Sequence, residues 1–513
     1  MFKNLMFLFI ALGCMALSNA QDRKKAARFF EAGNFEAALE EYILLYEKTP
    51  ADAQVNYRIG VCYLNTNIDK TKAISYLEFV TSLAQYDPNA LYLLGRAYHF
   101  NGEFDKAIKA FTRFIELGSG APDNRKEAGH YIDYCQNAKE LIKFPVKVSF
   151  ENLGRNVNSS NPDYLPFLPV DESFILFTSR RNDGSYERTN GGYFSNIYIS
   201  TKQDGKYGKA VMLEGVNQFG TEENIVGLSN SGNVAIIFRE NPNGSSELRM
   251  VFRKDGKFGQ ELPLDEKINS PRYTEIAATL SSDSSAIYFA SDRPGGYGGI
   301  DLYACRKLPN GKWSDPQNLG PSVNTLYDED FPSVSPDGNT LYFSSKGHTS
   351  MGGYDLFKAT FNEEKQRFMD VRSLGYPINT LGDDMNFRVS EDGKYGYLAA
   401  IRPEGFGDMD IYKVNFLEVE TRYTVFKGVI RSADSTLKPN ATFISVTNLA
   451  TGELFGEYQP NSSTMKYVVI LPPGRYSFFV ESEGFSGFQE EIEISDDGQN
   501  RFEIIHDILL QRE

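Results

Sequence analysis

The sequence predicts a multidomain chain with one helical and two all-β regions: a helical solenoid, a five-bladed β-propeller and a C-terminal β-sandwich. Three observations carry this prediction. A period of 34 to 35 residues runs through residues 21–143, and a period of 52 to 60 residues runs through residues 146–416. Short alternating strands with turn signals fill residues 421–513. Sustained periods of these lengths are typical of solenoids and propellers.

The composition argues against several functional classes. The 513 residues include 53 Lys and Arg but 68 Asp and Glu, which gives a net charge of −15. DNA, RNA and anionic lipid surfaces attract basic patches, so this charge disfavours them as partners. With 4 His and 4 Cys, there is little material for a metal or thiol enzyme. The 30 Tyr and 38 Phe suit β-rich cores and partner surfaces.

Residues 1–20 are predicted to be an export signal. Lys3 is followed by an apolar run from Leu5 to Leu17, and Ser18-Asn19-Ala20 has the small residues that a signal peptidase needs. A run of 13 residues is shorter than the ~20 that a spanning helix requires. Lipidation at Cys14 is a second interpretation, although Ala11 stands where a lipobox usually has Leu. We therefore expect the mature chain to lie outside the cytoplasm.

Three cysteines remain after the predicted cleavage: Cys62, Cys135 and Cys305. An odd number spread over different elements is not a disulfide framework. We expect three small buried thiols.

Small residues recur through the N-terminal region. Gly60, Gly95 and Gly129 lie 35 and 34 residues apart, and an alanine series has the same spacing: Ala38, Ala73 and Ala107. Small side chains at such positions let two helices approach closely. The pattern resembles the tetratricopeptide repeat, with Pro50 and Pro88 closing the first two units. Three repeats and a capping helix at residues 129–143 suffice for a solenoid spanning residues 21–143.

This resemblance implies that the first helix of each repeat lines a groove for a peptide or a partner helix. The family register places Tyr57, Tyr92, Arg96 and His99 at groove positions. The alternative interpretation is that these side chains pack against a neighbouring domain and bind nothing foreign. Both interpretations remain open at this point.

A second repeat covers residues 146–416, and its clearest copy runs from Asp330 to Lys346. Its hairpin turn recurs at five positions: Asp171, Ser231, Asp283, Asp337 and Asp392. An Asn that follows Val or Ile precedes each turn: Asn158, Asn217, Asn269, Asn324 and Asn379. Units of ~50 residues with about four short strands are propeller blades. Residues 147–155 are expected to complete the last blade, and the motif resembles PD40, WD40-like or TolB-like, propeller repeats.

One column of this repeat is acidic at every copy, eight residues before the turn: Asp163, Glu223, Glu275, Glu329 and Asp384. A ring of carboxylates near an axial channel would hold a cation or a basic peptide, because like charges focus the field there. The simpler interpretation is that each carboxylate accepts backbone N–H groups in its own blade.

A second set of residues is expected to form salt bridges within blades: Arg293 with Asp301, Lys346 with Asp355, and Arg402 with Asp410.

The C-terminal region contains Leu471-Pro-Pro-Gly-Arg-Tyr476 followed by Glu483-Gly484-Phe485. This pattern resembles the carboxypeptidase regulatory-like domain, a small β-sandwich that serves as a spacer or docking module.

No HExxH, CxxC, GxSxG or GxxxxGK[ST] motif is present in the sequence. We therefore expect no enzymatic activity, no cofactor and no metal. A glycosidase-like carboxylate pair is the competing possibility.

The order of these parts resembles PorE-type periplasmic proteins of the type IX secretion and gliding machinery. The resemblance implies a non-enzymatic scaffold whose partners are outer-membrane secretion or assembly subunits. Members of this type commonly continue into an OmpA-like peptidoglycan-binding domain, which this sequence lacks, so we expect a partner to supply any cell-wall anchor, unless the chain is a shorter paralogue with another client. The alternative function is a ligand-binding propeller for peptides or glycans, with a TolB-like or hydrolytic role.

Overall fold

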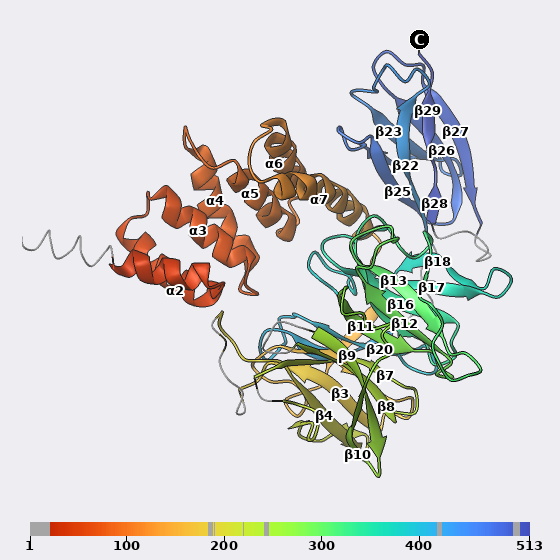
Figure 1. Ribbon diagram of the computed structural model, residues 1–513. Coiled ribbons are helices and arrows are strands. Elements are labelled where there is room, and N and C mark those ends of the chain that lie inside the picture. The colour runs from red at the N-terminus through yellow and green to blue at the C-terminus, as the bar shows by residue number, and fades with distance from the viewer. Residues whose placement is uncertain are drawn as a thin grey trace, which may run out of the picture. The chain divides into compact units, whose positions relative to one another are not determined.

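The computed structural model describes residues 21–182, 188, 190–218, 220–240, 246–417, 423–495 and 503–512. The predicted export signal and Cys14 lie outside these residues. The chain forms two compact units: one contains residues up to Cys135 together with the segment Tyr186–Tyr193, and the other contains the rest. The first unit is helical, and the second is all-β after the end of one shared helix (Figure 1).

The helical unit is built from consecutive helices, which confirms the predicted helical N-terminal region. Residues 21–31 are helical, and the following helices are α2 (Phe35–Lys48), α3 (Ala53–Leu64), α4 (Ala73–Ser82), α5 (Asn89–Phe100), α6 (Phe104–Glu116) and α7 (Pro122–Leu141). Two of them have side-chain caps, because Asn34 accepts the Ala37 N–H and Asp52 accepts the Gln54 and Val55 N–H groups.

Two of the recurring glycines make the close helix approach that their spacing predicts. A Cβ atom at Gly60 would lie 2.6 Å from the Leu77 side chain, and one at Gly95 would lie 2.6 Å from the Phe111 ring. The third glycine is different, because a Cβ atom at Gly129 would meet nothing within 4 Å. The repeat packing is therefore realised at α3 and α5 but not at Gly129 of α7.

Among the described residues of the second unit, five antiparallel sheets follow one another along the chain. Sheet 1 contains β2 (Asp163–Phe167), β3 (Phe174–Ser179), β4 (Asn196–Gln203), β5 (Lys206–Tyr207) and β6 (Val211–Met212). Sheet 2 contains β7 (Glu222–Leu228), β8 (Val234–Glu240), β9 (Ser246–Lys254) and β10 (Lys257–Pro263). Sheet 3 contains β11 (Glu275–Leu280), β12 (Ala286–Ser291), β13 (Asp301–Arg306) and β14 (Gln317–Asn318).

The last two of these sheets have the same layout. Sheet 4 contains β15 (Glu329–Val334), β16 (Thr340–Ser345), β17 (Asp355–Asn362) and β18 (Arg367–Ser373). Sheet 5 contains β19 (Arg388–Val389), β20 (Tyr395–Ala400), β21 (Asp410–Phe416) and the early strand β1 (Val148–Asn152). Strand β1 pairs with β21 from Val148↔Phe416 to Asn152↔Tyr412, so the predicted pairing of this N-terminal strand with the last copy is confirmed.

Contacts between strands link the five sheets in a closed order. Strand β2 contacts β7, β7 contacts β11, and β11 contacts β15. The Arg388 guanidinium on β19 donates to the Ser333 hydroxyl on β15 at 2.7 Å, and β20 contacts β2. The sequence of contacts therefore returns from sheet 5 to sheet 1.

The recurring asparagines fasten each sheet to the next. Each side-chain oxygen accepts the backbone N–H of a residue on the third strand of the preceding sheet at 2.7 to 2.9 Å: Asn158 with Ile411, Asn217 with Ile197, Asn269 with Leu248, Asn324 with Leu302, and Asn379 with Leu356. The Asn158 bond to Ile411 joins the first copy to the last. These buried or partly buried bonds satisfy strand groups that would otherwise lack partners.

The C-terminal region contains two further sheets. One is formed by β22 (Thr424–Ser432), β25 (Lys466–Leu471), β28 (Glu503–Ile505) and β29 (Ile508–Leu510). The other is formed by β23 (Phe443–Asn448), β24 (Leu454–Tyr458), β26 (Gly474–Glu481) and β27 (Phe488–Ile494). Residues of both sheets share one buried core, which includes Phe426, Val469 and Phe478.

Candidate functional site

The five recurring carboxylates lie near the start of the first strand of each sheet. All five are buried, with at most 5% of each residue exposed: Asp163, Glu223, Glu275, Glu329 and Asp384. Each accepts a backbone N–H from four or five residues earlier, at 2.6 to 3.1 Å: from Ser159, Gln218, Ser270, Thr325 and Thr380, respectively. The carboxylates therefore close the loop that leads into their own sheet.

In sheets 1 and 3 the carboxylate also binds a guanidinium. Arg181 donates to Asp163 at 2.5 Å and Arg293 donates to Glu275 at 3.0 Å. In each sheet the same arginine nitrogen also donates to a backbone carbonyl in the loop before the first strand. For Arg181 this acceptor is the Val157 carbonyl, at 2.7 Å. Burial raises the pKa of Asp163 and Glu275, whereas these ion pairs and hydrogen bonds oppose the rise.

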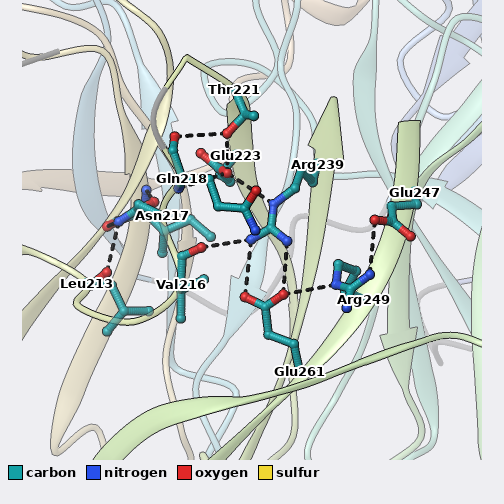
Figure 2. Close-up of polar contacts among 11 residues, drawn as sticks. Leu213, Val216, Asn217, Gln218, Thr221, Glu223, Arg239, Glu247, Arg249 and Glu261 are labelled. Atoms are coloured by element: carbon teal, nitrogen blue, oxygen red, sulfur yellow. Dashed lines mark hydrogen bonds and ion pairs between the residues drawn. The ribbon is translucent and has the colours of Figure 1, made fainter. Parts of the chain in front are cut away.

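Sheet 2 has an extended version of this arrangement, which Figure 2 shows. Arg239, 2% exposed, donates to Glu223 at 3.1 Å and to the Val216 carbonyl at 2.7 Å. Its two terminal nitrogens, one of which is also the donor to Val216, bind both oxygens of Glu261 at 2.9 and 3.1 Å. Arg249 joins the same carboxylate at 2.9 Å. Because two cations face Glu261, the pKa of this carboxyl is lowered. The network links the first three strands of the sheet to β10.

Sheet 4 lacks the arginine. Gly347 stands 18 residues after Glu329, where sheets 1 and 3 have Arg181 and Arg293. The loop carbonyl of Val323 instead accepts a hydrogen bond from Nε2 of His348 at 2.9 Å. Burial lowers the pKa of His348 to about 4, so the ring is neutral at pH 7.

The carboxyl of Glu329 is held by neutral donors. The hydroxyls of Thr325 and Ser345 each lie 2.7 Å from its oxygens. Burial raises the pKa of Glu329 to about 7, and that of the neighbouring Asp330 to about 7. Sheet 4 therefore carries acids that are partly protonated at neutral pH.

Sheet 5 is intermediate. Arg402 donates to the Pro377 carbonyl at 3.0 Å, and its guanidinium lies 3.1 Å from the centre of the Phe150 ring. Burial raises the pKa of Asp384 to about 7. The fully buried Asp355 is shifted in the same direction by burial and by the charge of Asp384.

The predicted salt bridges across the second hairpins are not the contacts that these basic residues make. Arg293 pairs with Glu275 of the first strand, and Lys346 pairs with Asp328 at 2.9 Å. Asp301 accepts the backbone N–H groups of Tyr297 and Gly298. The carboxylates at the start of the third strands thus close Gly-rich loops.

The four predicted groove residues lie in the helical unit. Tyr57 on α3 is half-buried against the core of that unit. Tyr92, Arg96 and His99 lie on α5 and contact residues of α7. The Tyr92 hydroxyl donates to Glu127, the Arg96 guanidinium lies 5.9 Å from the centre of the Tyr131 ring, and His99 is fully buried beside Cys135.

This placement has a simple cause. The first helix of each repeat packs against the first helix of the next, and α7 takes that place after α5. The side chains on this side of α5 are therefore covered by the chain itself, whereas Tyr57 lies on α3 and is half-buried against the core of the helical unit. The three cysteines are buried free thiols, as expected.

The chemistry available at these positions is limited. Among the described ranges, no group of three or more His, Cys, Asp or Glu residues is placed to hold a metal ion. Within the same ranges, no helix is long and apolar enough to cross a membrane.

Sequence reasoning missed Arg388, which stands four residues after Asp384. The other copies of the repeat have uncharged residues at this position: Phe167, Gly227, Thr279 and Ser333. The one sequence feature that could have identified Arg388 is its charge at a repeat position that is uncharged in the other copies.

The comparisons with known proteins are as follows. Residues 88–117, which span α5 and α6, match the tetratricopeptide repeat family. A comparison with curated proteins finds no match. Similar solved structures include TolB from Acinetobacter baumannii, with 15% identity, a TM-score of 0.33, and coverage of 58% of this chain and 71% of that one. A putative TolB from Agrobacterium tumefaciens has 15% identity, a TM-score of 0.28, and coverage of 53% and 98%. An α-L-arabinofuranosidase from Lactobacillus brevis has 11% identity, a TM-score of 0.30, and coverage of 50% and 91%.

Proposed function

We propose that this chain is a non-enzymatic scaffold of the bacterial periplasm that holds partner proteins in an outer-membrane-associated complex. The type IX secretion or gliding machinery is the system we propose. The observation that carries the proposal is the tetratricopeptide match at residues 88–117, because such repeats stack into extended surfaces that bind proteins.

In this proposal sheets 1 to 5 are the blades of a five-bladed propeller, and the two C-terminal sheets form a sandwich that serves as a docking module. The pairing of β1 with β21 supports the first assignment, because such a pairing joins the first and last parts of a ring. The core shared by the C-terminal sheets supports the second.

The contacts of the acidic column support a structural rather than a catalytic role. Each of these carboxylates accepts a backbone N–H from the loop that leads into its own sheet, and those of sheets 1 to 3 also bind an arginine. A glycosidase needs two carboxylates that flank one substrate bond. The buried, internally bonded carboxylates differ from that arrangement, so we favour the scaffold over the hydrolytic alternative.

The test is recovery of partners from cells. A chromosomally tagged protein would be cross-linked in the intact envelope, purified and analysed by mass spectrometry. We expect outer-membrane secretion or assembly subunits with the wild type. Tyr57→Glu on α3 should reduce their recovery, whereas the matched control Arg113→Glu on α6, at a side chain that is 60% exposed, should not. If no envelope partner is recovered reproducibly with the wild type, the scaffold proposal is wrong.

A further inference from the structure

Three hairpins of the β-rich unit carry a surplus of exposed cations. After the third strand of sheets 1, 2 and 3 the chain turns back at residues 204–209, 254–257 and 306–312. We call these three segments the basic tips. They contain two acids, Asp204 and Asp255, against seven exposed cations: Lys206, Lys209, Lys254, Lys257, Arg306, Lys307 and Lys312. The surplus is local, because the whole chain has a net charge of −15.

The basic tips lie at one end of the sheets, opposite the carboxylate column. The column lies near the start of the first strands, and the chain reaches each tip after running along three antiparallel strands. Neighbouring sheets point the same way. A Cβ atom at Gly232, after β7, would lie 3.0 Å from Pro169, after β2. A Cβ atom at Gly227, in the second half of β7, would lie 2.4 Å from the carbonyl of Ala278, in the second half of β11.

The charges of the basic tips are not neutralised by the chain. Among the described residues, none of the seven cations forms an ion pair. By contrast, Lys202, which precedes the first tip, binds Glu172 at 2.8 Å. The acids of the nearby turns, Asp171 and Asp283, accept backbone N–H groups within their own turns. Because charges are screened beyond ~10 Å at 0.1 M salt, a partner at this end meets the cations rather than the net charge of the chain.

The third tip also exposes apolar surface between its cations. Leu308 is 39% exposed, and the adjacent Pro309 is exposed as well. The Leu308 N–H donates to the Lys312 carbonyl at 2.8 Å, which closes the hairpin. Trp313 follows, partly buried, and pairs with Lys307 across the hairpin. Exposed apolar residues flanked by cations and a tryptophan are typical of surfaces that lie at a bilayer interface.

We propose that the basic tips dock on a membrane surface that carries anionic phospholipids, with the cations at the headgroup phosphates and Leu308 at the apolar boundary. Hairpins at one end of three consecutive sheets can meet a flat surface together. Six of the seven cations are lysines. Lysine is depleted in protein–protein interfaces, whereas lysine clusters bind anionic bilayers. The tips therefore suit lipid better than an acidic protein, although the net charge of the chain disfavours anionic lipid.

The test is binding of the purified chain, without its predicted export signal, to lipid vesicles at low salt. One set of vesicles contains phosphatidylcholine and phosphatidylglycerol in equal parts, and the other contains phosphatidylcholine alone. Co-sedimentation gives the affinity, and the emission of Trp313, the one tryptophan of the sequence, reports on the third tip. We expect at least tenfold stronger binding to the anionic vesicles, an emission shift to shorter wavelength, and release at high salt.

Charge reversal at the tips should abolish this preference. The variant Lys257→Glu/Lys307→Glu/Lys312→Glu should bind the anionic vesicles at least tenfold more weakly than the wild type. Arginine at the same three positions should preserve binding, because it retains the charge. The matched control reverses three exposed lysines of the helical unit, Lys24→Glu/Lys109→Glu/Lys126→Glu, and should bind like the wild type at the same net charge.

Several outcomes would overturn the proposal. These are absence of binding to the anionic vesicles, equal binding to both kinds of vesicle, equal binding by the tip variant, or an equal loss in the control variant. Binding to poly-L-glutamate but not to anionic vesicles would assign the tips to an acidic protein instead. The scaffold proposal is tested separately, since vesicle binding is measured on the purified chain and partner recovery is measured in cells.

Discussion

Sheets 3 and 4 are consecutive copies of one repeat, yet they treat the same buried carboxyl group in two different ways. In sheet 3, Glu275 is neutralised by the guanidinium of Arg293 at 3.0 Å. In sheet 4, Glu329 is surrounded by hydroxyl and backbone donors, and its pKa rises to about 7. The comparison teaches that a carboxyl group which closes a loop can be kept buried either by a counter-charge or by a proton.

The difference originates in the loop after the second strand. In sheet 4 this loop packs so closely on Thr325 that a Cβ atom at Gly347 would lie 2.1 Å from the threonine hydroxyl. A long side chain has no room there. His348 then provides the hydrogen bond to the Val323 carbonyl without a charge.

The largest effect is expected when the counter-charge of sheet 3 is removed. Arg293→Met would leave Glu275 buried beside Ser291 and the Ser270 N–H without a cation. Breaking a buried ion pair by removing one partner costs about 3–5 kcal/mol. We expect the free energy of unfolding in urea to fall by about that amount at pH 7.

The matched control is the double variant Arg293→Met/Glu275→Gln, in which neither charge remains. It should recover most of the lost stability, because a neutral amide is far less costly to bury than an unpaired carboxylate. If the double variant is as unstable as Arg293→Met, the loss comes from packing of the arginine against Phe289 and Tyr303 rather than from charge.

The second effect concerns the proton of sheet 4. Because the pKa of Glu329 is higher in the folded chain than in the unfolded chain, the folded state binds more protons between these two values. Stability contributed by this group therefore falls as the pH rises from about 4.5 to about 7 and is constant above that range. At ~1.4 kcal/mol per pKa unit the total penalty is on the order of 3 kcal/mol.

Glu329→Gln removes this titration while retaining a hydrogen-bonding group of the same size. We expect the variant to equal the wild type near pH 4 and to be more stable near pH 8 by up to about 3 kcal/mol. Urea unfolding of both proteins at several pH values gives the difference curve. A flat difference between pH 4 and pH 8 would contradict the raised pKa. Glu275→Gln is the contrasting variant, since it leaves Arg293 unpaired and should destabilise at every pH in this range.

Much of this architecture can be predicted from the sequence. The contact partners of individual side chains cannot, because they depend on distances within and between copies of the repeat. The helical N-terminal region and the pairing of residues 148–152 with the last sheet follow from periodicity and strand patterns. The position of the acidic column also follows, because a fixed offset from a hairpin turn fixes its place in the strand.

The partners of these residues were harder to infer. Arg293 was expected beside Asp301, which is nearer in sequence, but the guanidinium reaches across to Glu275. Tyr92 was predicted either to line an open groove or to pack against a neighbouring domain, and its hydroxyl contacts Glu127 of α7. In both cases the residue type was informative, whereas the choice among nearby partners depended on packing that no single copy of the repeat encodes. Arg388 is a third case, because its burial without an ion-pair partner among the described residues is visible only in the folded chain.

The smallest effect tests why sheet 4 lacks an arginine. Gly347→Ala places a methyl group 2.1 Å from the Thr325 hydroxyl, which donates to Glu329 at 2.7 Å. The loop must shift to relieve this contact, and overpacking of this kind costs about 1–3 kcal/mol. Because the shift weakens a hydrogen bond that favours the ionised carboxyl, the pKa of Glu329 should rise further. Urea unfolding should show the loss of stability, and the pH dependence of that stability should extend above pH 7.

The matched control is Gly259→Ala, which adds a methyl group with nothing within 4 Å and should leave stability nearly unchanged. Gly311→Ala is unsuitable as a control because Gly311 has a φ of +80°. Equal stability of Gly347→Ala and Gly259→Ala would show that the loop of sheet 4 has room for a side chain, and that steric exclusion is not the reason for the missing counter-charge.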